Sequence, residues 1–227
     1  MPNLWKIMKR KVRKQVERSV VDEFHRLYYS DADETWKKTF WFGVRVFKCP
    51  FDLWVYQEIL WALRPDIIVE TGTAHGGSAL YFASLLELIG KGRVITLDVS
   101  ASPKRPLHAR IEYVTGSSVA PDVVGYVRSV IKPGDTVMVV LDSDHRTAHV
   151  LDELRAYHSF VTPGSYLIVE DTNVNGHPVV PEHGPGPMEA VREFLKENST
   201  FEVDRSREKF CLTFNPDGFL RRKKIFA

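Results

Sequence analysis

Short apolar runs alternate with segments of helical periodicity through the middle of the chain. The runs predict strands at residues 66–70, 93–98, 111–115, 136–141 and 166–169, with helices at 77–89, 121–131 and 147–160. Strands that alternate with helices form a parallel sheet covered on both faces. A helix at 188–197 and two alternating segments, 201–204 and 209–215, follow. The pattern predicts an α/β, Rossmann-like fold: a mostly parallel seven-stranded sheet that ends in a C-terminal antiparallel hairpin.

The first 30 residues predict one helix with two contrasting faces. Apolar positions recur at helical spacing from Leu4 to Leu27, and the other face carries Lys6, Lys9, Arg10, Lys11, Arg13 and Lys14. Such a helix packs against the domain or a second subunit, or it makes weak contact with an anionic membrane surface. A polar linker follows, so we divide the chain into residues 1–35, the basic helix and linker, and residues 36–227, a single α/β domain.

Two further segments are predicted as loops near the strand ends. Residues 36–54 are rich in aromatic side chains, and Pro50 argues against a helix across that point. We therefore expect a loop over the site and then a helix from Asp52 or Leu53 to Leu63, with Asp52 as its N-cap. Residues 175–187 are dense in Gly and Pro, and we expect them to form a lid.

The composition narrows the possible classes of protein. A chain of 227 residues, 44% hydrophobic and 26% charged, supports one folded core. The net charge of +2 does not indicate a nucleic-acid partner. The two cysteines have no metal or redox spacing, no apolar run is long enough to span a bilayer, and the N-terminus does not resemble a signal peptide. We therefore expect a cytoplasmic location.

The glycine-rich loop after the first strand indicates the kind of cofactor. Glycines after a parallel strand let the backbone approach a nucleotide-like ligand. In the dinucleotide fingerprint the acid follows about 20 residues later, whereas here Glu70 precedes the first glycine. A carboxylate would repel a pyrophosphate but suits the amino group and positive charge of S-adenosylmethionine (SAM). The predicted cofactor contacts in this segment are Glu70, Gly72, Thr73, Gly76, Gly77 and Ser78.

Polar residues at later strand ends extend the predicted SAM site. Asp98, at the end of the second strand, is placed to accept both ribose hydroxyls. Ser117 and Ser118 follow the third strand and would bound the adenine, and Asp142 would face the cofactor or support the loop. Each also has a simpler explanation as a turn residue or helix cap.

Asp144, Glu170 and Asp171 form a second predicted group at the same sheet edge. Hard oxygen ligands suit Mg²⁺, which would hold an acceptor hydroxyl and lower its pKa. An iron site remains an alternative, since His145 and His177 could complete a triad of two histidines and one carboxylate. The candidate general bases are His145, His177 and Lys48, in that order.

Several motifs occur together in an order that resembles a known family. They are KCPFDLW from residue 48, RPD from 64, ETGTAHGGSAL from 70, LDSDH from 141, VEDTNVNGHPV from 169 and GPGPMEAV from 184. This set is similar to the cephalosporin hydroxylase (CmcI-like)/rhamnosyl O-methyltransferase family, over roughly residues 36–200.

The resemblance implies a class I methyltransferase fold and a SAM-dependent, Mg²⁺-assisted O-methyltransferase acting on a hydroxyl of a sugar or specialised metabolite. It also implies that Asp144, Glu170 and Asp171 match the family's metal ligands, that Glu70, the glycine loop and Asp98 match its SAM site, and that the protein forms a homo-oligomer through its N-terminal helix. The alternatives are an iron- or NAD-dependent oxidoreductase and a non-catalytic membrane-surface scaffold.

Overall fold

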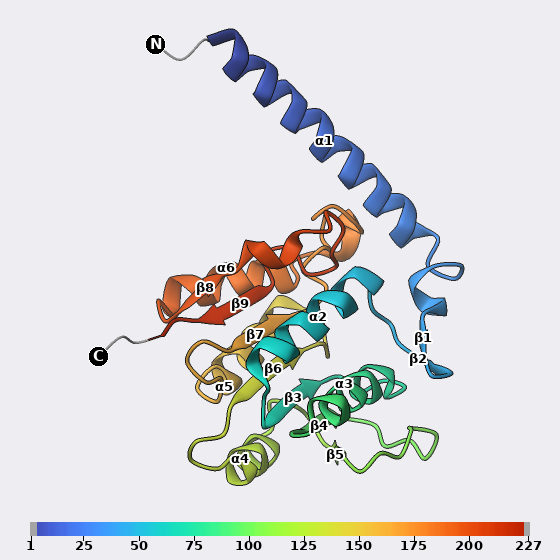
Figure 1. The fold of residues 1–227 in the computed structure, drawn as a ribbon, viewed down its shortest axis with the longest axis vertical. Helices are drawn as coiled ribbons and strands as arrows, with labels where there is room; N and C mark the ends of the chain where they lie inside the picture. Colours follow the sequence, from blue (N-terminus) through green and yellow to red (C-terminus); the bar gives the residue numbers. More distant parts are fainter. Residues whose placement is uncertain (1–3, 225–227) are drawn as a thin grey trace.

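A seven-stranded sheet forms the centre of the protein (Figure 1). The computed structural model describes the backbone of residues 4–224 and the side chains of residues 15–224. The strand order is β5-β4-β3-β6-β7-β9-β8. Five strands are parallel: β3 (Ile67–Thr71), β4 (Arg93–Asp98), β5 (Ile111–Thr115), β6 (Val137–Leu141) and β7 (Tyr166–Val169). β9 (Phe219–Arg222) pairs antiparallel with β7 and with β8 (Phe201–Val203). The predicted α/β sheet is confirmed.

Helices cover both faces of the sheet, because the central strands are apolar on both sides. Val69 and Val139 pack in one core cluster, with side chains of α4 (Pro121–Val130), α5 (Thr147–Tyr157) and α6 (Pro187–Glu197). The neighbouring residues Ile68 and Val140 pack in the other, with α2 (Pro50–Leu63) and α3 (Gly77–Ile89). Successive side chains of a strand point to opposite faces, so unbroken apolar runs fill both cores.

Two predicted elements differ in the structure. The predicted strand at 209–215 is wrong: the hairpin partner of β8 is β9, and Phe214 instead packs against aromatic side chains near the start of the chain. The predicted start of α2 is also wrong, because the helix begins at Pro50, where the missing N–H costs no helical hydrogen bond. Asp52 does not cap it; its carboxylate accepts a hydrogen bond from the Phe214 amide.

Further short elements surround the core. The predicted loop at 36–54 contains the η1 turn (Trp36–Lys38) and a hairpin of β1 (Phe40–Trp41) and β2 (Val44–Arg45). The turn η2 (Pro181–His183) lies in the Gly- and Pro-rich loop, and η3 (Arg205–Glu208) follows β8. None of the helices in the described part of the chain is long and apolar enough to cross a bilayer.

Helix α1 (Leu4–Ser30) projects away from the domain and is anchored by its C-terminal part (Figure 1). The buried His25 ring stacks on Phe214 with centroids 5.7 Å apart, and its Nε2 accepts a hydrogen bond of 2.9 Å from the Asn173 side chain. Tyr29 also packs on Phe214. The basic side chains of residues 6–14 lie outside the described residues, so their predicted role stays a prediction, as does the domain division at residue 35.

The His25 anchor should make stability depend on pH. Burial, reinforced by Arg26, lowers the pKa of His25 to about 4. The unfolded chain therefore binds a proton that the folded chain rejects, and stability is complete above pH 6.5 and falls as the pH drops towards 4. We expect the free energy of unfolding, measured in urea between pH 4.5 and 7.5, to depend less on pH in His25→Phe than in the unaltered protein. The difference in slope should reach up to about 1.4 kcal/mol per pH unit. Parallel curves for the two proteins would contradict the assignment.

Candidate active site

A cleft of about 680 Å³ opens at the carboxyl ends of the parallel strands. Its walls come from the loops after β3, β4, β5, β6 and β7 and from the segment that joins α1 to α2. The predicted site residues that line it are Gly72, Asp98, Ser117, Ser118, Asp142, Asp144, His145 and Asp171. The topology has thus brought half of the predicted site residues to one place.

The glycines of the β3 loop are required by close contacts within the protein. At Gly72, where φ is +85°, a Cβ would lie 1.7 Å from the carbonyl oxygen of Asp142. At Gly77 a Cβ would lie 2.1 Å from the carbonyl oxygen of Arg45. Gly76, also with positive φ, is the N-cap of α3. The loop is therefore packed tightly against neighbouring backbone, and the cofactor contacts expected of Thr73, Ser78 and these glycines stay predictions.

Glu70 lies beneath this loop and not on the cleft surface. Its side chain is fully buried, and Oε2 accepts a hydrogen bond of 2.7 Å from Thr96. Among the described residues Oε1 has no partner. Burial raises the pKa of Glu70, and the nearby Lys48 ammonium opposes that rise without cancelling it. Glu70 therefore carries an unused acceptor below the loop.

Asp98 is fixed by donors that leave part of its carboxylate on the cleft wall. Oδ2 accepts hydrogen bonds from the Ala74 amide at 3.0 Å and from Arg105 Nη2 at 2.8 Å, and Oδ1 accepts one from Ser100. A carboxylate has about four lone-pair sites, so further acceptor capacity remains. Sequence reasoning missed Arg105, because nothing in its spacing links it to the end of β4.

A buried ammonium group lies among the acidic residues. Lys48 Nζ is 2.8 Å from Asp142 Oδ2 and 2.6 Å from Glu170 Oε1, and the side chain is 1% exposed. Burial opposes its charge, but Asp142, Glu170 and Glu70 outweigh that effect and raise the pKa of Lys48. Because it holds its proton, Lys48 is placed to neutralise carboxylates, which argues against its role as a general base. Tyr56 donates a second hydrogen bond to Glu170, whose pKa burial raises to about 8.

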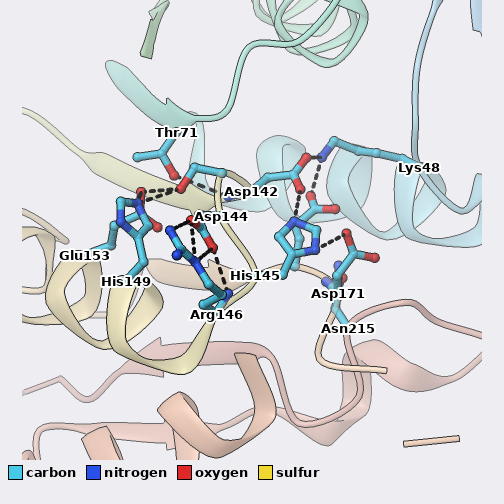
Figure 2. A network of polar contacts seen from close by, with 12 residues as sticks. Lys48, Thr71, Asp142, Asp144, His145, Arg146, His149, Glu153, Asp171 and Asn215 are labelled. Atoms are coloured by element: carbon cyan, nitrogen blue, oxygen red, sulfur yellow. Dashed lines mark hydrogen bonds and ion pairs between the residues drawn. The ribbon is translucent and has the colours of Figure 1, made fainter. Parts of the chain in front are cut away.

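His145 lies between two carboxylates on the cleft surface (Figure 2). Its Nδ1 is 3.3 Å from Asp171 Oδ2 and its Nε2 is 3.5 Å from Asp142 Oδ1. Burial lowers the pKa of His145, but Asp171 and Asp142 outweigh it and raise the pKa to about 9. The Asp171 amide donates to the Asn215 side chain, which fixes this turn. His145 is therefore the predicted base that the structure places with acidic partners inside the cleft.

The same three side chains are the candidate metal ligands of the described structure. One atom each from Asp142, His145 and Asp171 lies within 4.8 Å of the others, so a single cation would fit among them. Two carboxylates suit Mg²⁺, which completes its shell with water and substrate oxygens. The arrangement differs from the predicted set of Asp144, Glu170 and Asp171: Glu170 Oε1 is bound to Lys48 and Tyr56.

Asp144 is bound by its neighbour Arg146 (Figure 2). The backbone amide and the guanidinium of Arg146 both donate to it, and these bonds lower the pKa of Asp144 to about 2. The carboxylate lines the cleft but does not share the group formed by Asp142, His145 and Asp171.

His177 lies outside the cleft. Its Nε2 is 2.8 Å from Glu189 Oε1, and it lines a second cavity, between α1 and α6, with Gly176 and Pro178. The predicted iron triad of His145, His177 and a carboxylate is therefore wrong, and the role of His177 as a base has no support in this arrangement. The described lining of the cleft includes no residue from 175–187, so the predicted lid is not part of its wall here.

Three aromatic side chains form part of the cleft wall. Tyr29, Trp36 and Phe47 line the cleft. Tyr29 and Trp36 stack with ring centroids 5.3 Å apart, and Trp36 meets Phe47 edge to face. Tyr29 was missed by sequence reasoning because it falls within the predicted N-terminal helix, far from the predicted loop.

The fold is the Rossmann-like fold of class I methyltransferases. The solved structure titled CmcI-N160 apo-structure superposes with a TM-score of 0.65 and 24% identity, covering 83% of this chain and 78% of that chain. An O-methyltransferase from Bacillus cereus in complex with SAH gives a TM-score of 0.52 and 16% identity, with 81% of both chains covered. At these identities the likeness is one of fold.

Sequence comparison identifies the family. The family model Rhamnosyl O-methyltransferase/CmcI matches residues 33–223. Rhamnosyl O-methyltransferases of Mycobacterium tuberculosis and Mycobacterium leprae are each 39% identical over 212 residues, covering 90% of this chain and 85% and 91% of theirs. The chain belongs to the rhamnosyl O-methyltransferase/CmcI family, which confirms the resemblance found in its motifs.

The geometry predicts that Asp142 contributes to metal binding and Asp144 does not. We expect Asp142→Asn to weaken binding of Mn²⁺, a paramagnetic substitute for Mg²⁺, by at least about tenfold, because a charged ligand is lost. Asp144→Asn, the matched control two residues away, should leave the affinity nearly unchanged. Electron paramagnetic resonance titration measures both, and the reverse ranking would favour the predicted set of Asp144, Glu170 and Asp171.

Proposed function

We propose that the protein is a SAM-dependent, Mg²⁺-assisted O-methyltransferase whose acceptor is a sugar hydroxyl. The observation that carries the proposal is the position of Asp98 and the Asp142–His145–Asp171 group on the walls of one cleft. The first is suited to a ribose and the second to a cation beside the reacting oxygen. Membership of an O-methyltransferase family supports the same reaction.

Each part of the cleft then has a chemical task. Asp98 would hold the ribose hydroxyls, and Asp142 and Asp171 would hold the metal. Bound Mg²⁺ would supply Lewis-acid stabilisation of the acceptor oxygen. His145, the third member of the group, would stay free of the metal and take the hydroxyl proton as the methyl group is transferred. To do so, His145 must be neutral. Asp142 and Asp171 stabilise its protonated form, and the same two carboxylates would bind the cation, so metal binding would favour the neutral ring.

The aromatic wall supports a sugar as the acceptor. Tyr29, Trp36 and Phe47 offer apolar faces in the same cleft as the acidic group, and the C–H faces of a sugar ring pack well on such surfaces. The relatives named above are rhamnosyl O-methyltransferases. A rhamnosyl group, whose C6 is a methyl group, is therefore the acceptor that we propose.

The direct test combines cofactor binding with methyl transfer. Calorimetry should show SAM binding that Asp98→Ala weakens by at least about tenfold, since ribose hydrogen bonds to a charged group are lost. Asp122→Ala, on the exposed side of α4, is the control. Labelled SAM should methylate simple rhamnosides when Mg²⁺ is present and fail to do so with a chelator. Absence of SAM binding, or stoichiometric iron in the purified protein, would overturn the proposal.

We also propose that α1 joins two copies of the chain. Val16, Val20, Phe24 and Leu27 recur at helical spacing and are 49–65% exposed, so one face of the helix carries an uncovered apolar stripe. The opposite face, with His25, packs on the domain. Contiguous exposed apolar surface of this kind is typical of protein or membrane contacts.

The stripe gives a clear prediction for assembly. Val20→Glu with Leu27→Glu should convert an oligomer to a monomer in analytical ultracentrifugation, because charged groups would have to be buried in the contact. Glu17→Gln with Asp22→Asn, on the same helix, is the control and should leave the assembly intact. A monomeric parent protein would contradict the contact between copies, and co-sedimentation with anionic vesicles would then favour the membrane.

A cytoplasmic location is part of the proposal. Both cysteines are free thiols, Cys49 buried and Cys211 exposed, which suits a reducing compartment.

A further inference from the structure

A polar cluster beside the proposed cofactor site is not used by the mechanism above. His149, in the first turns of α5, has its Nε2 3.2 Å from Ser118 Oγ and 3.1 Å from Ser143 Oγ. The same nitrogen is 3.4 Å from Glu153 Oε1, which accepts a hydrogen bond of 2.7 Å from Ser143 (Figure 2). We call these four residues the His149 cluster. It joins the loops after β5 and β6 to α5.

The burial of Glu153 shows that the cluster is an internal polar contact and not a surface ion pair. The Glu153 side chain is 1% exposed, and within the described part of the chain its Oε2 has no partner. A carboxylate buried in this way needs a nearby cation or donor. The hydrogen bond to Glu153 raises the pKa of His149, and the smaller effects of burial and of Arg146 oppose that rise while Asp144 adds to it. Glu153 therefore favours a proton-donating ring.

The cluster lies where the base of the cofactor would be. His149 and Ser118 line the cleft together with Ser117, Leu97 and Val99, next to Asp98. With the ribose on Asp98, the attached base would lie between the apolar side chains and this wall. The His149 side chain is 22% exposed, and no hydrogen bond involves its Nδ1 among the described residues. In the doubly protonated ring that Glu153 favours, Nδ1 carries a second donor hydrogen, and the Ser118 hydroxyl lies on the same cleft wall.

We infer that His149, positioned by Glu153, acts with Ser118 to recognise the edge of adenine: His149 donates to N1, and the Ser118 hydroxyl accepts from the 6-amino group. The inference rests on the proposed function, because it requires a SAM-type cofactor in the cleft. Hypoxanthine carries a hydrogen on N1, so the His149 donor would meet a second donor there. The Ser118 hydroxyl can donate as well as accept, so it tolerates the carbonyl oxygen at C6, and the discrimination comes from His149. The site should therefore distinguish adenine from hypoxanthine.

A purely structural role gives a different expectation. If the cluster only fastens α5 to the loops, its loss would loosen the whole cleft and weaken every cofactor analogue alike. If it reads the base, its loss would weaken adenine binding and relieve the penalty on hypoxanthine. The ratio of the two affinities separates these roles, whereas either affinity alone does not.

The test compares S-adenosylhomocysteine with S-inosylhomocysteine by calorimetry. We expect the unaltered protein to prefer the adenosyl compound by about 100-fold or more, and His149→Ala and Glu153→Gln to reduce that preference to about tenfold or less. His158→Ala is the matched control, since His158 follows the same helix and packs on Phe194 away from the cleft. It should keep the full preference.

The outcomes are distinguishable. No preference in the unaltered protein, or an unchanged ratio in both variants, would overturn the inference while leaving the proposed function intact. Failure of the unaltered protein to bind either compound would instead overturn the proposed function. If His149→Ala does not fold, Glu153→Gln decides, because glutamine keeps the size of the side chain and an oxygen acceptor for Ser143.

Discussion

The site depends on one buried charge, the Lys48 ammonium between Asp142 and Glu170. The topology of a parallel sheet brings acidic strand ends to one edge, where like charges about 4 Å apart repel by about 4 kcal/mol at an effective dielectric constant of 20. Burial adds to that cost. Lys48 offsets both effects with two short contacts, and breaking such a buried network typically costs about 3–5 kcal/mol. The acidic cleft can therefore exist without a bound ligand.

The carboxylates of the cleft differ in the kind of partner that each has. Glu170 is held by groups that are themselves buried, Lys48 and Tyr56, so its contacts cannot exchange with solvent. Asp171 instead faces His145, which lies on the cleft surface. For these two neighbours in the sequence, the buried partners fix Glu170 in a structural role, whereas the partner of Asp171 lies on the cleft surface and can give way to a cation or an acceptor.

The N-terminal helix connects the cleft to the outside of the molecule. Tyr29 at its end forms part of the aromatic wall, and His25 one turn earlier fixes the helix to the buried Asn173, two residues beyond Asp171. The exposed stripe from Val16 to Leu27 belongs to the same rigid element. The uncovered apolar face and part of the cleft wall therefore belong to one helix.

The sequence by itself determined the sheet, its covering helices and the edge at which the acidic residues gather, because strands buried on both faces must be continuously apolar. It also placed Glu70 and Asp98 at strand ends. Tertiary structure alone decided which acidic residues act together. Asp142 and Asp144 are equivalent in local pattern, yet one meets Lys48, 94 residues away, and the other its neighbour Arg146. His177 was separated from His145, and Phe214 from its predicted strand, for the same reason: pairing depends on contacts between distant segments, which local periodicity does not encode.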